Sequence, residues 1–123
     1  MAEAPGTRLI FSFAELIGDD LGRLVWTPMR PGVERCDLYS VPGGSAASVL
    51  RYAPGGRTPR HRHDGHEHIV VLSGSQEDDH GVYETGAVIV NPPGSSHAVQ
   101  SPGGCVVLVV WERAIHFEDD SHL

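Results

Sequence analysis

The amino-acid sequence predicts an all-β fold, either a sandwich or a barrel of antiparallel strands, built as a single domain. A chain of 123 residues is long enough to bury one hydrophobic core. The 15 glycines and 9 prolines are many for this length, and they favour frequent turns over long helices. Short apolar and β-branched runs recur between these turn signals at intervals of roughly 8 to 12 residues, which is typical of sandwiches and barrels.

We expect three parts along the chain: an N-terminal segment (1–23), a strand-rich body (24–113) and a C-terminal tail (114–123). In the first part, the alternating "LIFSF" (9–13) predicts an added strand or arm. The stretch "AELIGDDLG" (14–22) that follows has the length and spacing for one helical turn.

The strand-rich body divides into short apolar segments, each bounded by glycine, proline or asparagine. The expected strands are 24–26, 36–41, 47–53, 66–74, 81–83, 87–90, 97–100 and 105–113. Four large aromatic side chains are expected in the core rather than at a ligand site. They are Trp26, Tyr52, Tyr83 and Trp111. An apolar interior wall is expected from Val49, Ile69, Val71, Val99 and either Val107 or Leu108.

The charge balance argues against nucleic-acid and membrane partners. The formal net charge is −7, and the 9 basic residues are scattered arginines, so no basic face is available for a phosphate backbone. The longest apolar run (105–111) is far shorter than the about 18 residues of a membrane span. We expect no signal peptide in the first 16 residues, and the distant Cys36 and Cys105 suit reduced thiols in a cytoplasmic protein.

The segment "HRHDGHEHIVVL" contains half of the eight histidines of the chain, together with one glutamate. Side chains along a strand alternate between its two faces. This alternation groups His61, His63 and Glu67 on one face, provided that the intervening Asp-Gly turn keeps the count. It leaves His66 and His68 on the other face, where we expect them to flank a site rather than to form it.

A further histidine follows in "GAVIVNPPGSSHAV" (86–99). A strand runs into a rigid Asn-Pro-Pro-Gly turn, and because proline cannot continue a β-ladder, the chain returns with His97 at the start of the next strand. This histidine is placed to complete a ligand set begun by His61, His63 and Glu67.

Such a set suits a divalent transition metal. Imidazole favours Zn, Fe, Cu and Ni, and a single carboxylate adds tolerance for Fe²⁺ or Mn²⁺. Three neutral imidazoles and one carboxylate carry a charge of −1, so a bound divalent ion leaves the site at +1. An octahedral ion would keep two positions open for exogenous ligands, whereas tetrahedral zinc would be saturated.

At these positions the sequence resembles the cupin superfamily, through two spaced patterns that match its motifs at every signature position. They are Gly55-x5-His61-x-His63-x3-Glu67-x6-Gly74 and Gly86-x5-Pro92-x-Gly94-x2-His97. The usual asparagine of the second motif is replaced by Ser101, which affects a turn or a supporting contact and not a ligand. The resemblance implies a cupin (RmlC-like) antiparallel jelly-roll β-barrel with one divalent metal. The implied ligands are His61, His63, Glu67 and His97.

The resemblance is closer to the ChrR-type cupins and covers about residues 24–112. It rests on "WTPMRPGV" (26–33), "LRYAPGGRTPRHRH" (50–63), "EDDHGVYETGAVIVNPPGSSHA" (77–98) and "GC" (104–105). This group includes the cupin domain of the ChrR anti-sigma factor and stand-alone cupin dioxygenases that act on small ketones and diketones. Cupins of this size often pair through strand exchange, so the resemblance also implies a homodimer.

The resemblance implies two functions of different classes. The first is a mononuclear non-heme metal dioxygenase, with Fe²⁺ favoured, that acts on a small ketone, diketone or related metabolite. The second is a non-catalytic zinc- or ligand-sensing module that regulates a partner protein. The ions Zn²⁺, Mn²⁺, Ni²⁺ and Cu²⁺ are alternatives to iron. The sequence contains no HxxxCxxC motif like that of the helical zinc domain of ChrR, so a sensor would need a different partner surface.

The remaining histidines and charges are expected to be structural or solvated. His80 is expected in a loop, and His116 and His122 in solvent. The acidic run 77–79 is expected at the solvated tip of a hairpin, and alternation directs Arg62 away from the neighbouring histidines. No catalytic residue is predicted beyond the metal centre itself.

Overall fold

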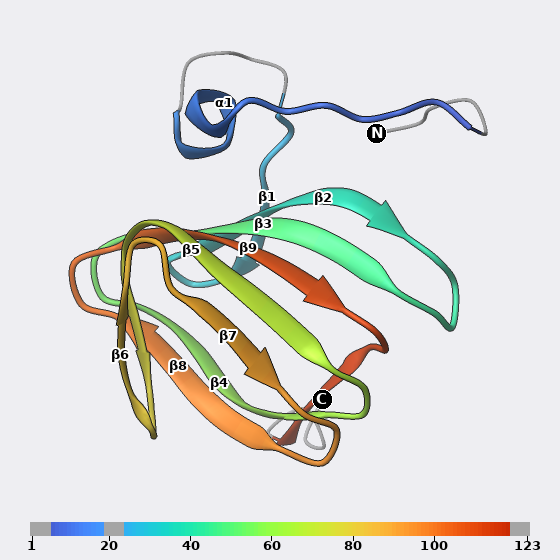
Figure 1. Ribbon diagram of the computed structural model, residues 1–123. Coiled ribbons are helices and arrows are strands. Elements are labelled where there is room, and N and C mark those ends of the chain that lie inside the picture. The colour runs from blue at the N-terminus through green and yellow to red at the C-terminus, as the bar shows by residue number, and fades with distance from the viewer. Residues whose placement is uncertain (1–5, 19–23, 119–123) are drawn as a thin grey trace.

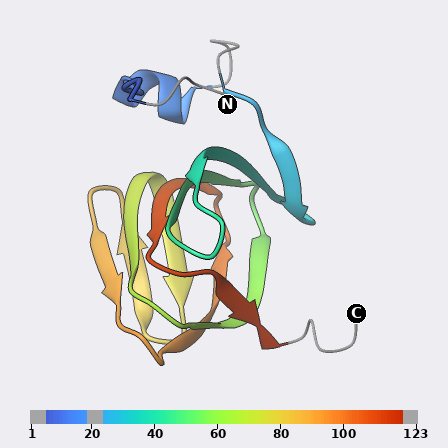
Figure 2. The ribbon, with the colours of Figure 1, turned by 90° about the vertical axis from the view of Figure 1, so that its right-hand side faces the viewer.

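The computed structural model describes residues 6–18 and 24–118, in which antiparallel strands curl into a barrel (Figure 1; Figure 2). The strands are β1 (Thr27–Arg30), β2 (Val33–Ser40), β3 (Ala46–Tyr52), β4 (Gly56–His63), β5 (Glu67–Asp78), β6 (Gly81–Glu84), β7 (Val88–Asn91), β8 (Ser96–Ser101), β9 (Cys105–Trp111) and β10 (Ile115–Phe117). They are ordered β1-β2-β3-β9-β5-β8-β4-β10, and β6 and β7 also pair with β5. The predicted all-β antiparallel class is confirmed.

The bounds of several strands shift by a few residues, and two strands of the body differ more strongly from the prediction. β4 was not predicted as a strand, because its sequence of histidine, arginine and proline lacks an apolar alternation. β1 begins at Thr27 rather than at residue 24, and it includes Pro28. The structure accommodates this proline because β1 lies at the edge of the sheet, where one missing hydrogen bond is tolerated.

Residues 9–12 of the N-terminal segment form no strand, and the helix α1 (Phe13–Ile17) lies where one helical turn was predicted within 14–22. The Ser12 hydroxyl accepts a hydrogen bond from the Glu15 backbone N–H, and the Glu15 carboxylate accepts one from the Ser12 N–H, both at 3.1 Å. This capping box satisfies the first helical N–H groups and outweighs the alternating pattern. No helix among the described residues is long and apolar enough to cross a membrane.

The predicted C-terminal tail is part of the sheet at 115–117, where β10 pairs with β4. Residues 119–123 of that tail, and residues 1–5 and 19–23 of the N-terminal segment, lie outside the described residues. The short β10 therefore extends the barrel along the strand that carries two of the clustered histidines.

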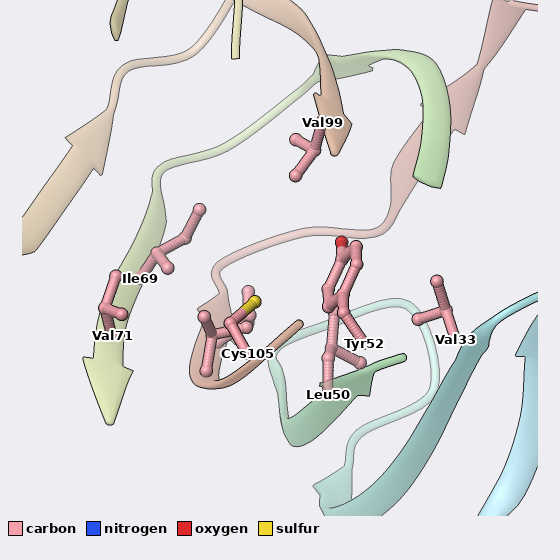
Figure 3. Close-up of a cluster of buried hydrophobic side chains, with 9 residues drawn as sticks. Val33, Leu50, Tyr52, Ile69, Val71, Val99 and Cys105 are labelled. Carbon is pink, nitrogen blue, oxygen red and sulfur yellow. The ribbon is translucent and has the colours of Figure 1, made fainter. Parts of the chain in front are cut away.

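The interior of the barrel is filled by one apolar cluster. Leu50 and Tyr52 of β3 lie across from Ile69 and Val71 of β5 and from Val99 of β8 (Figure 3). Val107 belongs to the same cluster, so most of the predicted interior wall is confirmed. The two cysteines, Cys36 and Cys105, are buried free thiols.

A second cluster lies on the other face of β3, β5 and β9. Val49, Leu72 and Val106 form it, and Leu16 of helix α1 and Trp26, which precedes β1, pack against it. The prediction that Val49 lines the interior is therefore wrong, because both faces of β3 are covered and alternation alone does not identify the inner one.

Two irregularities change which side chains point inward. In the β5–β9 pairing the register shifts between Val71 and Ser73, so that even-numbered residues of β5 face the interior beyond this point. Gly74, at φ 71°, follows directly, and a Cβ at this position would lie 2.2 Å from the Gly104 carbonyl oxygen. A similar shift between Thr58 and His61 changes the parity of β4.

Candidate metal centre

The four predicted ligands converge inside the barrel. His61 and His63 lie on β4, Glu67 opens β5 and His97 lies near the start of β8. One nitrogen or oxygen from each residue lies within 4.8 Å of those of the other three. Each residue is at most 3% exposed. No other comparable group of histidine, cysteine and acidic side chains occurs in the described part of the chain.

Strand register and one turn bring these residues together. His61 and His97 are directly opposite each other in the β4–β8 pairing. The Pro-Pro-Gly turn before β8 is fixed to β4, because the Gly94 N–H donates to the His63 carbonyl at 2.7 Å and the His63 N–H donates to the Ser95 carbonyl at 2.9 Å. The predicted role of this turn in positioning His97 is in keeping with these bonds.

Hydrogen bonds fix the ring orientation of the two histidines on β4. His61 Nδ1 donates to the Pro59 carbonyl oxygen at 2.9 Å. His63 Nδ1 lies 2.9 Å from Ser95 Oγ, whose own hydrogen is directed to the Pro92 carbonyl at 2.6 Å. Ser95 must therefore accept a hydrogen bond from His63. Both rings then carry their proton on Nδ1 and direct an Nε2 lone pair toward the centre.

His97 is oriented by Asp78, the last residue of β5. His97 Nδ1 donates to Asp78 Oδ2 at 2.9 Å, and the other oxygen of Asp78 accepts from the Tyr83 hydroxyl and the His80 N–H, each at 2.8 Å. Burial raises the pKa of Asp78, but these bonds outweigh it and lower the pKa below the usual range. Burial and this carboxylate also raise the pKa of Tyr83 to about 12, so its hydroxyl stays a donor.

Asp78 is not among the site residues predicted from the sequence. It belongs to the acidic run 77–79, which was predicted to be solvated, yet its side chain is only 4% exposed. The neighbouring Asp79 does lie at the surface, where it pairs with Arg60. The register shift in β5 turns Asp78 inward, and no sequence pattern marks that shift apart from Gly74.

The Glu67 carboxylate is held by its two cross-strand neighbours. Glu67 is opposite Asn91 on β7 and Trp111 on β9. Asn91 Nδ2 donates to Oε1 at 3.0 Å and Trp111 Nε1 donates to Oε2 at 2.6 Å. Burial raises the pKa of Glu67, but the adjacent His63 and His97 side chains outweigh burial and lower the pKa below the usual range, so the carboxylate is ionised. Trp111, predicted as a core aromatic, packs against the inner cluster and also supports this site.

The donor set fits a metal ion. His63 Nε2 is buried 3.0 Å from Glu67 Oε1, but two acceptors form no hydrogen bond, and it has no other hydrogen-bond partner among the described residues, which is costly for an acceptor that has left water. The Nε2 atoms of His61 and His97 face each other at 3.0 Å. Burial, reinforced by His97, lowers the pKa of His61 to about 4 although the Pro59 carbonyl raises it. A neutral His61 has a lone pair available, and a central cation would satisfy all of these atoms.

The other histidines lie outside this cluster. His66 and His68 are exposed on the opposite face, with their rings stacked at 6.3 Å between centroids, as the alternation predicts. His80 lies in the turn after β5, and the exposed His116 on β10 contacts the Asp64 carboxylate at 2.5 Å. His122 lies outside the described residues.

Fold and site together define a cupin. The chain belongs to the ChrR cupin-like domain family, whose model matches residues 17–120. None of the curated proteins matches the chain. The predicted jelly-roll barrel is confirmed by similarity to solved cupin structures. An acetylacetone dioxygenase from Acinetobacter johnsonii has a TM-score of 0.73 at 16% identity, over 98% of this chain and 87% of that one.

Two further structures are similar in fold. The complex of SigE with the anti-sigma ChrR from Rhodobacter sphaeroides gives a TM-score of 0.69 at 24% identity, over 80% of this chain and 55% of that one. A protein with a cupin-like fold from Ralstonia eutropha JMP134 gives 0.65 at 23% identity, over 72% of this chain and 60% of that one. The match therefore spans little more than half the length of these two chains.

Proposed function

We propose that this protein is a metal-dependent cupin, and specifically a mononuclear non-heme metal dioxygenase that acts on a small ketone, diketone or related metabolite. The observation that carries this proposal is the complete buried set of three histidines and one glutamate. Each imidazole is oriented by a separate hydrogen bond, which is the arrangement that a metal site requires. The similar fold of an acetylacetone dioxygenase supports the choice of reaction.

In this function, each part of the site has a separate task. When bound, a redox-active divalent ion such as Fe²⁺ supplies the chemistry of oxygen activation and substrate chelation. His61, His63 and His97 hold it through Nε2, and Glu67 supplies the negative charge. The apolar wall formed by Ile69, Val99 and Val109 keeps bulk water away from the reacting atoms.

A second candidate is a zinc- or ligand-sensing module that regulates a partner protein. It is favoured by the fold similarity to the anti-sigma ChrR and by the size of the cavity beside His61, Glu67 and His97, which is only about 20 Å³. Tetrahedral zinc would be saturated by the four side chains and needs no further space. A homodimer, a cytoplasmic location and the lack of nucleic-acid and membrane partners stay predictions from the sequence.

Metal analysis and oxygen uptake distinguish the two candidates. The protein is purified without added metal, its bound metal is measured, and it is reconstituted with Fe²⁺. Oxygen consumption is then followed with acetylacetone and a panel of related diketones and hydroxyketones. An oxygenase consumes oxygen only when substrate is present. The His97→Ala variant should consume no oxygen under the same conditions. Stoichiometric zinc that resists exchange, together with no oxygen uptake, would refute the oxygenase and leave the sensor.

A further inference from the structure

A surface groove of about 470 Å³ opens close to the four converging residues. One side is formed by β2 and the turn after it, and the other side by residues 113–117. Its charged side chains are balanced, because two arginines, Arg35 and Arg113, line it together with two aspartates, Asp37 and Asp64. The groove therefore has no strong preference for ligand charge, and its shape is the property that can discriminate between ligands.

The groove and the inner cavity share a wall. The inner cavity of about 20 Å³ is bordered by His61, Glu67 and His97, and it has the size of roughly one water molecule. Met29 and Ile115 line both the groove and this cavity, as does Trp111. All three are only partly buried, so each has one side toward the groove and one toward the ligand cluster.

The three shared residues are not equally fixed. Trp111 donates a hydrogen bond to the Glu67 carboxylate and is held by it. Ile115, in contrast, belongs to β10, which has three residues and pairs with β4 at the edge of the sheet. Short edge segments with few contacts open at a lower free energy than the core. Met29 lies on β1, which is the strand at the opposite edge.

β10 lies directly along the ligand strand. Ile115 is opposite His63 and Phe117 is opposite His61 in the β4–β10 pairing. The rings of Phe117 and His61 are 5.4 Å apart between centroids, and the Arg30 guanidinium lies 4.2 Å above the Phe117 ring. β10 and the β1 edge therefore meet on the side of the ligand cluster that carries the groove.

We propose that the groove is the entrance to the metal centre and that Ile115 and Met29 form a gate that sets the size of the ligand admitted. This inference rests on the proposed metal centre and goes beyond it by naming the path and the selective residues. A cavity of about 20 Å³ does not accommodate a chelating molecule, because small-ligand pockets measure about 300–1,000 Å³. The gate must move to admit one. The ligand class is a small, uncharged or weakly charged molecule with two adjacent oxygen donors on a short apolar skeleton.

Hydroxamates of different size test the gate independently of catalysis. Acetohydroxamate and benzohydroxamate present the same two oxygen donors on a small and a large skeleton. Their binding to the Co²⁺-loaded protein is followed through the visible absorption of the ion, with azide as a probe too small for the gate to discriminate. The variants are Ile115→Ala, Met29→Ala and Ile115→Trp, and Val82→Ala on the exposed face of β6 serves as the matched control.

We expect the unsubstituted protein to bind acetohydroxamate about tenfold or more tightly than benzohydroxamate, as expected when a pocket excludes the larger skeleton. Ile115→Ala and Met29→Ala reduce the ratio of the affinities for acetohydroxamate and benzohydroxamate. Ile115→Trp weakens the binding of both hydroxamates. Azide binding and Co²⁺ content stay unchanged, and Val82→Ala behaves like the unsubstituted protein.

The proposed gate would be refuted if both alanine variants kept the affinity ratio of the unsubstituted protein for the two hydroxamates. This conclusion requires that the variants have full Co²⁺ content and an unchanged circular dichroism spectrum. Failure of the proposed function appears differently. A protein that binds no Co²⁺ refutes the metal centre and the entrance with it. Normal gating of hydroxamates without oxygen uptake by the Fe²⁺ form refutes the oxygenase alone and leaves the gate in place.

Discussion

His97 and Asp78 form a hydrogen bond between two neighbouring strands, with 2.9 Å between Nδ1 and Oδ2. A carboxylate in this position fixes the tautomer of the imidazole and increases the basicity of Nε2, which faces the ligand cluster. Asp78 is itself held by Tyr83 and by the backbone of His80. The orientation of one candidate ligand is thus set by residues of the β5–β6 hairpin.

Replacing Asp78 by asparagine should weaken metal binding by about 10- to 100-fold, the usual effect of removing a supporting carboxylate. Asparagine has a similar size but lacks the negative charge and offers one acceptor oxygen to the three donors that Asp78 receives. The measurement is a competition titration with a chelator. Asp79→Asn is the control, because Asp79 pairs with Arg60 and accepts from the Ala98 N–H without touching a candidate ligand. Equal losses in both variants would contradict the role of Asp78.

The composition of the ligand set is tested by single alanine substitutions. His97→Ala should reduce the bound metal to well below one equivalent, because it removes one of four donors from a buried site. His66→Ala and His68→Ala should keep full metal content, because both side chains are exposed on the opposite face. Elemental analysis of the purified variants measures this. Metal loss in His66→Ala with retention in His97→Ala would refute the assignment.

Trp111→Phe should destabilise the protein by about 1–3 kcal/mol, which is typical when a buried ionised group loses a hydrogen-bond donor. Phenylalanine keeps a ring in the core but cannot donate to Glu67 Oε2. Urea unfolding of the metal-free protein gives the free energy of unfolding. Trp26→Phe is the matched control, since Trp26 packs in the outer cluster and lies against Arg51 at 4.1 Å. An equal or larger loss in Trp26→Phe would argue against a special role of the Trp111 N–H.

Metal binding should stabilise the folded protein. An ion that binds only the folded state at a free concentration 100 times its dissociation constant adds about 2.7 kcal/mol to the free energy of unfolding. Thermal melting with and without EDTA measures the difference as a lower melting temperature after chelation. The His97→Ala variant should melt at the same temperature in both conditions. A chelator effect of equal size in that variant would place the stabilising ion elsewhere.

Gly74→Ala should destabilise the fold more than Gly86→Ala. Both glycines have positive φ, at 71° and 94°, so each alanine carries a strain of about 1–3 kcal/mol. Only Gly74 adds a collision, because its Cβ would lie 2.2 Å from the Gly104 carbonyl oxygen, whereas no heavy atom lies within 4 Å of a Cβ at Gly86. Urea unfolding of the two variants isolates the collision. Equal destabilisation would mean that the backbone relaxes freely at Gly74.

The ligand cluster could be predicted from the sequence because it depends on spacing and on turns that leave few alternatives. His61, His63 and Glu67 alternate in one segment, and the Pro-Pro-Gly turn returns His97 to face them. Asp78 could not be predicted in this way. A register shift in β5 lies between Glu67 and Asp78 and reverses which residues of the strand face the interior.

Other differences have equally local causes. The stretch 9–13 does not form the expected strand, because the reciprocal bonds of Ser12 and Glu15 act over three residues, do not depend on the sheet, and begin helix α1 at Phe13. β10 was predicted as tail, since three residues are too few for an alternation pattern, and its strand state depends on the pairing with β4. Trp111 was assigned to the core by its size, and its hydrogen bond to Glu67 becomes visible only through the β5–β9 register.

The strand β5 carries Glu67 at its first position and Asp78 at its last. Because side chains alternate, a slip of this strand by one residue would turn both carboxylates out of the interior at once. A chain with β5 paired incorrectly would then lose the direct carboxylate donor and the residue that orients His97, and it would not retain the ion. The ion would thus bind only chains in which β5 is paired correctly, and its binding would stabilise these chains over the mispaired ones during folding.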